Sequence, residues 1–372
     1  MAFTLTLPAR ANLLGNPSDG NEGDFATILA AIELRAQARI QPAADLIFEH
    51  SDLQAGPAEI YPRSRLPLPY TGNHDLLKGA LNRLHAYSPE LRQKIIIHGF
   101  HISVGTQVPR QSGLGGSSLF VLLMLAGLRQ LYSLDHYRHN DYLLSETAQR
   151  AEALELGITC GYADRYVQLF GGLAYIDYRC KLEQRPLDEE PYATYERLDG
   201  RAGVLPLVAA TTGVQRDSGD VHGRMRPRYL EEYHQWQRDG GEQPPLVRLM
   251  HQVGETAWQG KIALLRDDKR AFGALMNRNH ALVDEMMSLC GFTDGAGWAN
   301  NLFIQTALQS GALGAKLTGA GGGGSVFALA SPGEEEKIIR AWSEAAQKHG
   351  LTECNIFPLE IATQGLTIVE EA

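Results

Sequence analysis

The segment PRQSGLGGSSLF, Pro109–Phe120, combines glycines and hydroxyl groups in the manner of a phosphate-binding loop. Glycines lack a Cβ, so they let a backbone turn sharply and approach a ligand closely. Two serines stand where an apolar helix is expected to begin, and helix-initial amides carry the partial positive charge that suits phosphate. Serine hydroxyls can also ligate Mg²⁺, which prefers oxygen donors. A plain glycine turn with a serine cap is the competing interpretation. The residues concerned are Gly113, Gly115, Gly116, Ser117 and Ser118.

A second glycine-rich segment, KLTGAGGGGSVFAL, covers Lys316–Leu329 and holds the pattern GxGxxG at Gly319, Gly321 and Gly324. A dinucleotide-binding loop requires a helix after these glycines. The residues that follow here, SVFALA, are typical of a strand, which argues against that class of site. Two interpretations stay open: a glycine-rich hairpin between strands, or a backbone that approaches a phosphate or the first glycine loop.

The third segment is PARANLLGNPSDGNEG, Pro8–Gly23. Arg10 and Asp19 flank a loop in it that is too polar and too rich in turn residues for a helix or a strand. A surface ion pair is the simple interpretation of either residue alone. Beside two phosphate-type loops, a place in the same site is the interpretation we favour.

Two further carboxylates are candidates for metal and proton chemistry. Glu152 shares one face of an expected helix with Ala148 and Leu156, at four-residue spacing. An unpaired carboxylate among such neighbours is costly, and a metal ion would offset that cost; a partly exposed Glu that reaches water is the alternative. Asp164 could accept a proton from a hydroxyl or pair with Arg165.

The elements that must position these residues alternate between strands and helices, which predicts α/β or α+β domains. We expect a strand, a polar loop and an apolar stretch in the first thirty-odd residues, then a helix over 76–86 and a strand or strand pair over 94–105. A buried helix should cover 119–132. Asn140 or Asp141 should cap a helix that Gly157 ends. The later expected elements are strands at 171–178, 204–212 and 355–362, helices at 245–266, 269–290 and 334–349, and strand-like runs flanking the second glycine cluster.

Length and composition set the outer limits. At about 150 residues per domain, 372 residues predict two domains, and the polar stretch 181–201 suggests domains at 1–200 and 201–372. A net charge of −9 argues against a nonspecific nucleic-acid binder. The first residues do not resemble a signal peptide, and the apolar run 119–128 is shorter than the roughly 20 residues that span a bilayer. We therefore expect a cytoplasmic protein with no membrane or nucleic-acid partner.

The P-loop pattern and the HRD and DFG motifs of protein kinases are missing from the sequence. Two phosphate-type glycine loops, magnesium-type oxygens and a candidate base are present, and this combination resembles the GHMP kinases. Their three motifs look like Pro8–Gly23, Pro109–Ser118 and Lys316–Ser325, in the same order. Asn16 and Pro17 stand where many sugar-kinase relatives have Glu and His, as in the glucuronokinase-like branch. Bacterial heptose-phosphate kinases share the pattern ELGI…G…DR…GG, which here runs from Glu155 to Gly172.

The resemblance implies an α+β (mixed α/β) two-domain fold, with an amino-terminal domain like ribosomal protein S5 domain 2 and a ferredoxin-like carboxy-terminal domain. It implies that Asp164 and Arg10 are catalytic and that Ser117 and Glu152 hold Mg²⁺. The implied ATP-binding residues are Pro109, Gly113, Leu114, Gly115, Gly116, Ser117, Ser118, Gly319, Gly321 and Gly322. The implied substrate-binding residues are Gly15, Asn16, Asp19, Asp164 and Gly322.

The implied reaction is ATP-dependent phosphorylation of a sugar, with the anomeric hydroxyl of D-glucuronate as acceptor and glucuronate 1-phosphate as product. Alternatives are another sugar or sugar phosphate, such as a heptose 7-phosphate or fucose, and a non-catalytic sugar-binding protein. A homodimer is compatible with the resemblance. A uronate carboxylate calls for an arginine, and the candidates are Arg165, Arg216, Arg224, Arg226 and Arg228.

Overall fold

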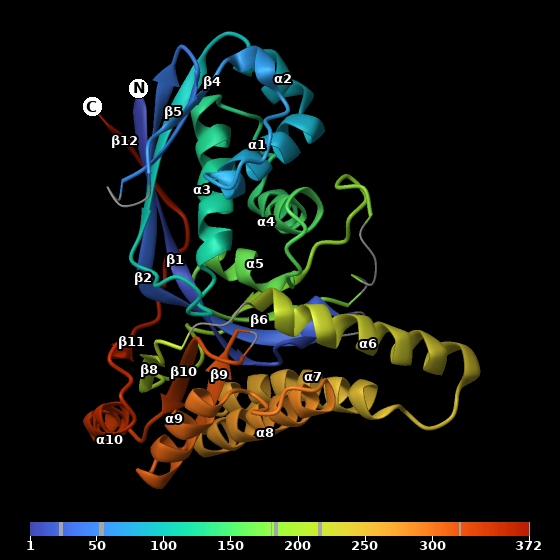
Figure 1. Ribbon diagram of the computed structural model, residues 1–372, viewed down its shortest axis with the longest axis vertical. Helices are drawn as coiled ribbons and strands as arrows, with labels where there is room; N and C mark the ends of the chain where they lie inside the picture. Colours follow the sequence, from blue (N-terminus) through green and yellow to red (C-terminus); the bar gives the residue numbers. More distant parts are fainter. Residues whose placement is uncertain are drawn as a thin grey trace.

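Two β-sheets, each covered by helices, form the frame of the molecule (Figure 1). The computed structural model describes residues 1–21, 25–51, 56–179, 181, 185–214, 218–319 and 321–371, with the side chains of 218–220 and 222 outside the description. The end of the first loop, 22–24, and the candidate Arg216 therefore lie outside the described residues.

The larger sheet has eight strands in the order β12-β1-β2-β5-β3-β4, and β6 and β7 extend it from the other end of β2. The long strand β2 pairs with β5 through residues 36–43 and with β6 through residues 26–30. All pairings are antiparallel except β3 with β5. The strands are β1 (Ala2–Leu14), β2 (Ala26–Ala43), β3 (Leu46–His50), β4 (Glu59–Tyr61), β5 (Gly99–Thr106), β6 (Leu173–Asp177), β7 (Thr194–Arg197) and β12 (Thr367–Glu371).

Helices cover one face of this sheet (Figure 1). The expected buried helix is α3, which is apolar nearly all round and largely inaccessible. Asn140 caps α4 by accepting a hydrogen bond of 3.0 Å from the amide of Leu143, and the helix passes into a single π-helical turn, Ala151–Glu155. The α-helices of this half are α1 (Asp75–Tyr87), α2 (Pro89–Ile95), α3 (Gly116–Leu131), α4 (Asp141–Arg150) and α5 (Ala163–Phe170).

The strand expected from residue 94 begins later. Helix α2 runs to Ile95, and β5 starts only at Gly99. Ser88 caps α2 through the amide of Leu91, and Pro89 occupies its first turn, a combination that starts helices. The apolar residues between the two elements, Ile96 and Ile97, are 69% and 74% exposed, so their hydrophobicity does not reflect a strand.

The smaller sheet is antiparallel, in the order β11-β8-β10-β9. Strands β9 and β10 pair directly, with Thr318 opposite Ser325, so the second glycine segment joins two strands of a hairpin and no helix follows it. The strands are β8 (Leu207–Thr211), β9 (Gly314–Thr318), β10 (Ser325–Leu329) and β11 (Asn355–Leu359), and the helices are α6 (Ser218–Asp239), α7 (Pro245–Leu265), α8 (Lys269–Leu289), α9 (Trp298–Gln309) and α10 (Glu335–Lys348).

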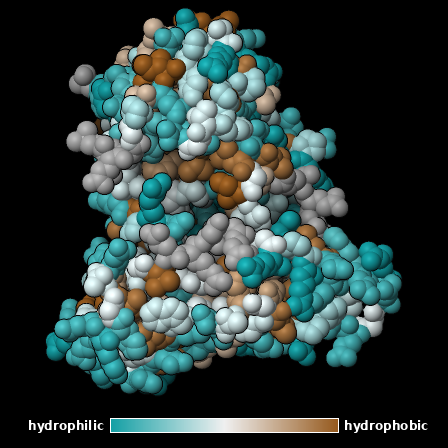
Figure 2. Space-filling model, in the orientation of Figure 1, coloured by the Kyte–Doolittle hydropathy of each residue, from teal (hydrophilic) through white to brown (hydrophobic). Residues whose placement is uncertain are grey.

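The two halves meet along an apolar interface. Ala257 and Phe272, from α7 and α8, belong to the same buried cluster as Leu14 and Ile28 of the larger sheet. Figure 2 shows apolar residues gathered across the middle of one face of the molecule. Strand β12, which the sequence did not predict, returns the end of the chain to β1, and a domain limit at residue 200 stays a prediction. Among the described residues, no helix is long and apolar enough to cross a membrane.

Candidate active site

The first glycine loop leads from β5 into α3 and leaves the helix end open. Gly113 and Gly115 have φ of +71° and +79°, a conformation that favours glycine. Gly115 is the N-cap residue, and no side chain caps α3 within the described part of the chain. The first amide groups of a helix have no intrahelical acceptor, so Gly116, Ser117 and Ser118 present the amides expected for phosphate. Pro109 is exposed at the start of this loop.

The two glycine loops touch each other across the two halves of the molecule. A Cβ on Gly113 would lie 3.0 Å from the carbonyl oxygen of Thr318, and one on Gly319 would lie 3.0 Å from Cα of Gly113. Ser325 Oγ donates a hydrogen bond of 2.7 Å to the carbonyl of Ser112. Both interpretations of the second glycine segment are therefore correct. The segment forms a hairpin, and it also approaches the first glycine loop closely.

Gly321 and Gly322 contact the second half of the chain, whereas Gly324 lies against Ser112 of the first glycine loop. A Cβ on Gly321 would lie 3.0 Å from Sδ of Met287 in α8, and the amide of Gly322 donates a hydrogen bond of 2.7 Å to Ala296. Asn300 Nδ2 donates to the carbonyl of Gly323 at 3.1 Å. These contacts anchor the loop on its own half of the chain, and contacts of Gly321 and Gly322 with ATP or substrate stay predictions.

Arg10 ties the candidate base to the first glycine loop. Its Nε and Nη2 donate hydrogen bonds of 2.5 Å to the two carboxylate oxygens of Asp164, and its Nη1 donates to the carbonyl of Gly113. The side chains of Arg10 and Asp164 are 7% and 19% exposed. The amide of Arg10 also donates to the carbonyl of Leu114 at 3.2 Å. Asp164 therefore forms its bidentate ion pair with Arg10, and Arg165, the alternative partner suggested by the sequence, pairs with Glu152.

Arg165 instead belongs to a buried cluster around Glu152. The carboxylate of Glu152 is fully buried and accepts from Arg165 Nη2, from Ser117 Oγ at 2.6 Å and from Ser118 Oγ at 3.3 Å. Burial lowers the pKa of Arg165, but the negative charges of Cys160, Glu152 and Asp164 and the hydrogen bond to Glu152 hold it above its usual range. An arginine thus compensates the charge of Glu152. The alternative of a partly exposed Glu that reaches water is wrong, and a metal at Glu152 stays a prediction.

The same oxygens suit Mg²⁺. A carboxylate and a hydroxyl are hard donors, and Mg²⁺ is usually held by one or two carboxylates together with substrate phosphates. Ser117 is exposed and faces Glu152 Oε1, whereas Ser118 is buried against Oε2, which Arg165 also occupies. Ser117 with Oε1 is therefore the fitting pair. No group of three or more His, Cys, Asp or Glu side chains could hold a metal within the described ranges.

Asp19 belongs to the segment Pro8–Gly23 and lies beside Asp164. It belongs to a short 3-10 turn, Ser18–Gly20, and its Oδ2 accepts a hydrogen bond of 3.0 Å from the amide of Ala163, in the first turn of α5. Burial raises the pKa of Asp19, and the negative charge of Asp164 raises it further. The site thus contains two neighbouring acids beside the open end of α3.

The other predicted residues of the segment Pro8–Gly23, Gly15 and Asn16, form hydrogen bonds with the second half of the chain. The amide of Gly15 donates to Asn279 Oδ1 at 2.8 Å. Asn16 is buried, and its side chain donates to the carbonyl of Gly319 at 3.2 Å and accepts from Lys316 Nζ at 2.8 Å. Both residues fasten the first loop to the second half of the chain, and direct contact with substrate stays a prediction for them.

Lys316 and Asn279 are site residues to which the sequence analysis gave no role. Lys316 is fully buried, and its Nζ also donates to the carbonyls of Asn12 at 3.0 Å and Leu317 at 2.7 Å. Burial and the charge of Arg10 lower its pKa. A lysine between Ala315 and Leu317 in an apolar strand was a signal of a buried polar contact. Asn279 offered no comparable signal in its helix.

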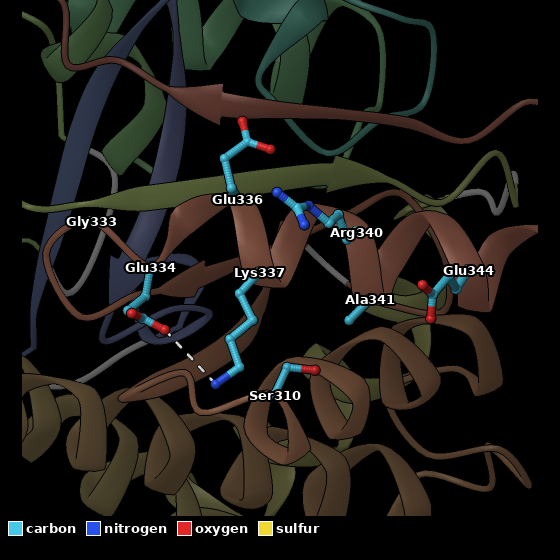
Figure 3. Close-up of a pocket in the computed structure, with 8 residues that line it drawn as sticks. All are labelled: Ser310, Gly333, Glu334, Glu336, Lys337, Arg340, Ala341 and Glu344. Carbon is cyan, nitrogen blue, oxygen red and sulfur yellow. Dashed lines mark ion pairs between the residues drawn. The ribbon is translucent and has the colours of Figure 1, made fainter.

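A hollow outside the candidate site runs along α10 (Figure 3). It has a volume of about 360 Å³ and is lined by Ser310 and by residues of the segment 333–344. Glu334 and Lys337 form an ion pair of 3.8 Å at its edge. None of its lining residues belongs to the three loops, so this hollow is not part of the candidate site.

Comparisons with family models match both halves of the chain. Residues 75–172 match the model of the GHMP kinases N terminal domain, and residues 261–348 match that of the GHMP kinases C terminal region. Among curated proteins, the chain is 29% identical to glucuronokinase 1 of Arabidopsis thaliana, covering 95% of this chain and 91% of that protein. It is 30% identical to probable glucuronokinase 2 of the same plant, covering 92% and 87%.

Solved structures are similar over nearly the whole chain. The complex of Lactococcus lactis galactokinase with galactose has a TM-score of 0.75 at 19% identity and covers 98% of this chain and 95% of that one. A D-glycero-D-manno-heptose 1-phosphate kinase from Bacteroides thetaiotaomicron has a TM-score of 0.67 at 19% identity, covering 100% and 99%. These likenesses confirm the expected two-domain fold of mixed α and β structure.

Proposed function

The chain belongs to the GHMP kinase family, and on that premise we propose that it transfers the γ-phosphate of ATP to the anomeric hydroxyl of D-glucuronate. Membership makes the chain a phosphotransferase that acts on a hydroxyl group, with ATP as the donor that the family uses. The names of its two plant relatives support glucuronate as the acceptor, and the product is then glucuronate 1-phosphate.

The contact between Arg10, Asp164 and Gly113 is the observation that carries this proposal. It joins a carboxylate to the loop whose amides suit the phosphates, so acceptor and donor can meet at one place. Phosphoryl transfer depends mainly on such positioning and on charge stabilisation. Asp164 orients the sugar hydroxyl and accepts its proton as the phosphate is transferred. Arg10 holds that carboxylate in its ionised form, because an adjacent cation favours the charged state.

The open N-terminus of α3 stabilises negative charge on the phosphates through Gly116, Ser117 and Ser118 amides. Ser117 Oγ and Glu152 Oε1 are the residues that would hold Mg²⁺, with the phosphates completing its ligands. A bound Mg²⁺ would supply positive charge that offsets the negative charge of the phosphates during transfer. Arg165 fixes the Glu152 carboxylate from its other side, so Oε1 stays directed at Ser117.

A panel of acceptors tests the function. The purified protein is incubated with ATP, Mg²⁺ and D-glucuronate, D-galacturonate, D-glucose, L-fucose or a heptose 7-phosphate, and ADP release is measured. We expect D-glucuronate to give the highest kcat/KM, and phosphorus NMR of the product to show coupling to the anomeric proton. A higher kcat/KM with a heptose phosphate or fucose would replace glucuronate as acceptor, and no ADP release with any sugar would contradict the kinase assignment.

A further inference from the structure

Helix α6, in the second half of the chain, carries an arginine that contacts the segment Pro8–Gly23. Val221, Met225 and Tyr229 recur at four-residue spacing on α6 and are buried in the core of the second half. Arg226 follows Met225 and so lies beside that buried face. Its Nε donates a hydrogen bond of 2.9 Å to the carbonyl of Gly20. Figure 1 shows α6 between α5 and α7, where it can bridge the two halves.

The contact with Gly20 places Arg226 on the acceptor side of the candidate site. Gly20 follows Asp19 directly, in the same short turn. A Cβ on Gly161 would lie 2.1 Å from Asp19 Oδ2 and 3.2 Å from the amide nitrogen of Gly20, so this turn packs against the segment that enters α5. Asp164 lies in the first turn of α5. Arg226 therefore contacts the turn that carries Asp19, and this turn packs beside the start of α5, which carries Asp164.

The guanidinium group of Arg226 keeps one edge for a ligand. Gly20 takes its Nε–H, and within the described residues its two terminal nitrogens have no hydrogen-bond or ion-pair partner. The side chain is half-buried. Its charge lowers the pKa of Tyr162, the residue that precedes α5, although burial raises that pKa to about 12. Two parallel N–H groups match the two oxygens of a carboxylate.

The other candidate arginines have other partners. Arg165 is buried against Glu152. Arg224 lies over the ring of Phe292, 4.9 Å from its centroid. Arg228 pairs with Glu232 at 3.0 Å, and Arg216 lies outside the described residues. Among the candidate arginines that the structure describes, Arg226 is therefore the one that contacts the segment Pro8–Gly23 and keeps N–H groups available for a ligand.

An acidic acceptor needs such a cation here. Asp19 and Asp164 repel a substrate carboxylate, and a desolvated carboxylate without a counter-charge is strongly disfavoured. We propose that Arg226 binds the carboxylate of a uronic acid acceptor and that this contact makes the enzyme prefer a uronate to the neutral sugar of the same shape. The inference rests on the proposed function and names the residue that recognises the acid group.

The test compares two acceptors in matched variants. D-Glucose carries a hydroxymethyl group where D-glucuronate carries its carboxylate. Loss of charged hydrogen bonds in R226Q should lower kcat/KM for D-glucuronate by about 10- to 100-fold, chiefly through KM. The value for D-glucose should stay about the same. R226K should retain part of the preference, because it keeps the charge but loses the fork. R228Q, changed on the same helix, serves as the control and should keep the wild-type preference.

Each outcome is informative. A preference for D-glucuronate that survives in R226Q overturns the role of Arg226 and leaves the proposed function intact. Equal losses on both sugars indicate a structural role and overturn it as well. A wild-type enzyme that phosphorylates D-glucose as efficiently as D-glucuronate contradicts the uronate assignment itself, before any variant is compared.

Discussion

Replacing Asp164 by asparagine removes the proposed base and leaves the shape of the site in place. Loss of general-base catalysis lowers rates by about 10²- to 10⁴-fold, which corresponds to roughly 3–5 kcal/mol of barrier. The stability cost is separate. Arg10 donates two hydrogen bonds of 2.5 Å to this carboxylate, and asparagine offers one oxygen. We therefore expect about 1.5–3 kcal/mol less stability from the lost charged hydrogen bond, which a domain of this size tolerates.

Asp199→Asn is the matched control for this variant. Asp199 also accepts two hydrogen bonds from an arginine, Arg197, at 3.0 and 2.6 Å, but the two side chains are 20% and 44% exposed. Such surface pairs contribute at most about 1 kcal/mol. Urea unfolding followed by circular dichroism measures stability, and ADP release measures kcat. An Asp164→Asn enzyme that is folded and retains a kcat similar to that of the control would refute the assignment of the base.

Three further substitutions test the loops. Ser117→Ala should raise the Mg²⁺ concentration that gives half-maximal rate about tenfold, because a metal ligand is lost. Ser118→Ala should leave this concentration unchanged. Equal shifts of the two variants in an MgCl₂ titration would exclude Ser117 as the specific ligand. Gly319→Ala should cost about 2–4 kcal/mol, since its Cβ would meet the other loop and its φ is +76°. Gly240→Ala, with φ of +68° and nothing within 4 Å, should cost only about 1–2 kcal/mol, and similar urea midpoints for both would contradict the loop contact. Asp19→Asn should move the acid limb of the kcat/KM profile to lower pH, because it removes a negative charge that disfavours ionisation of the neighbouring carboxylate; an unmoved limb would mean that the two acids do not interact.

Local sequence was enough to predict the elements that carry the glycine loops. Gly113 and Gly115 cannot continue a strand, and the apolar run after Ser118 has the length of a buried helix, so a loop and a helix were expected there. The strand-like residues after Gly324 argued against a helix there and left a hairpin as one of two interpretations. These features depend on neighbours in the chain, and the structure confirms them.

The ion pairs between residues that are distant in the sequence could not be predicted from the local sequence. Glu152, Asp164, Arg165 and Arg10 offer two acids and two cations, and every pairing is chemically reasonable. The structure selects Arg10 with Asp164 and Arg165 with Glu152, because β1 and α5 face each other only in the folded chain. The choice of Arg226 among the arginine candidates depends in the same way on the contact of α6 with Gly20.

Helix α6 was missed for a local reason. It contains Gly219, Gly223 and Pro227, residues that disfavour a helix interior. Burial of Val221, Met225 and Tyr229 supplies the packing that outweighs those preferences.

The pairing of β12 with β1 has a consequence for folding. Residues 2–6 align with residues 367–371, so this part of β1 gains its second neighbour only when residues 367–371 dock against it. Until then one side of β1 presents unpaired amides and carbonyls, which is the kind of edge that recruits strands from other chains. A truncation before residue 367 would leave this edge permanently unpaired and should therefore increase aggregation.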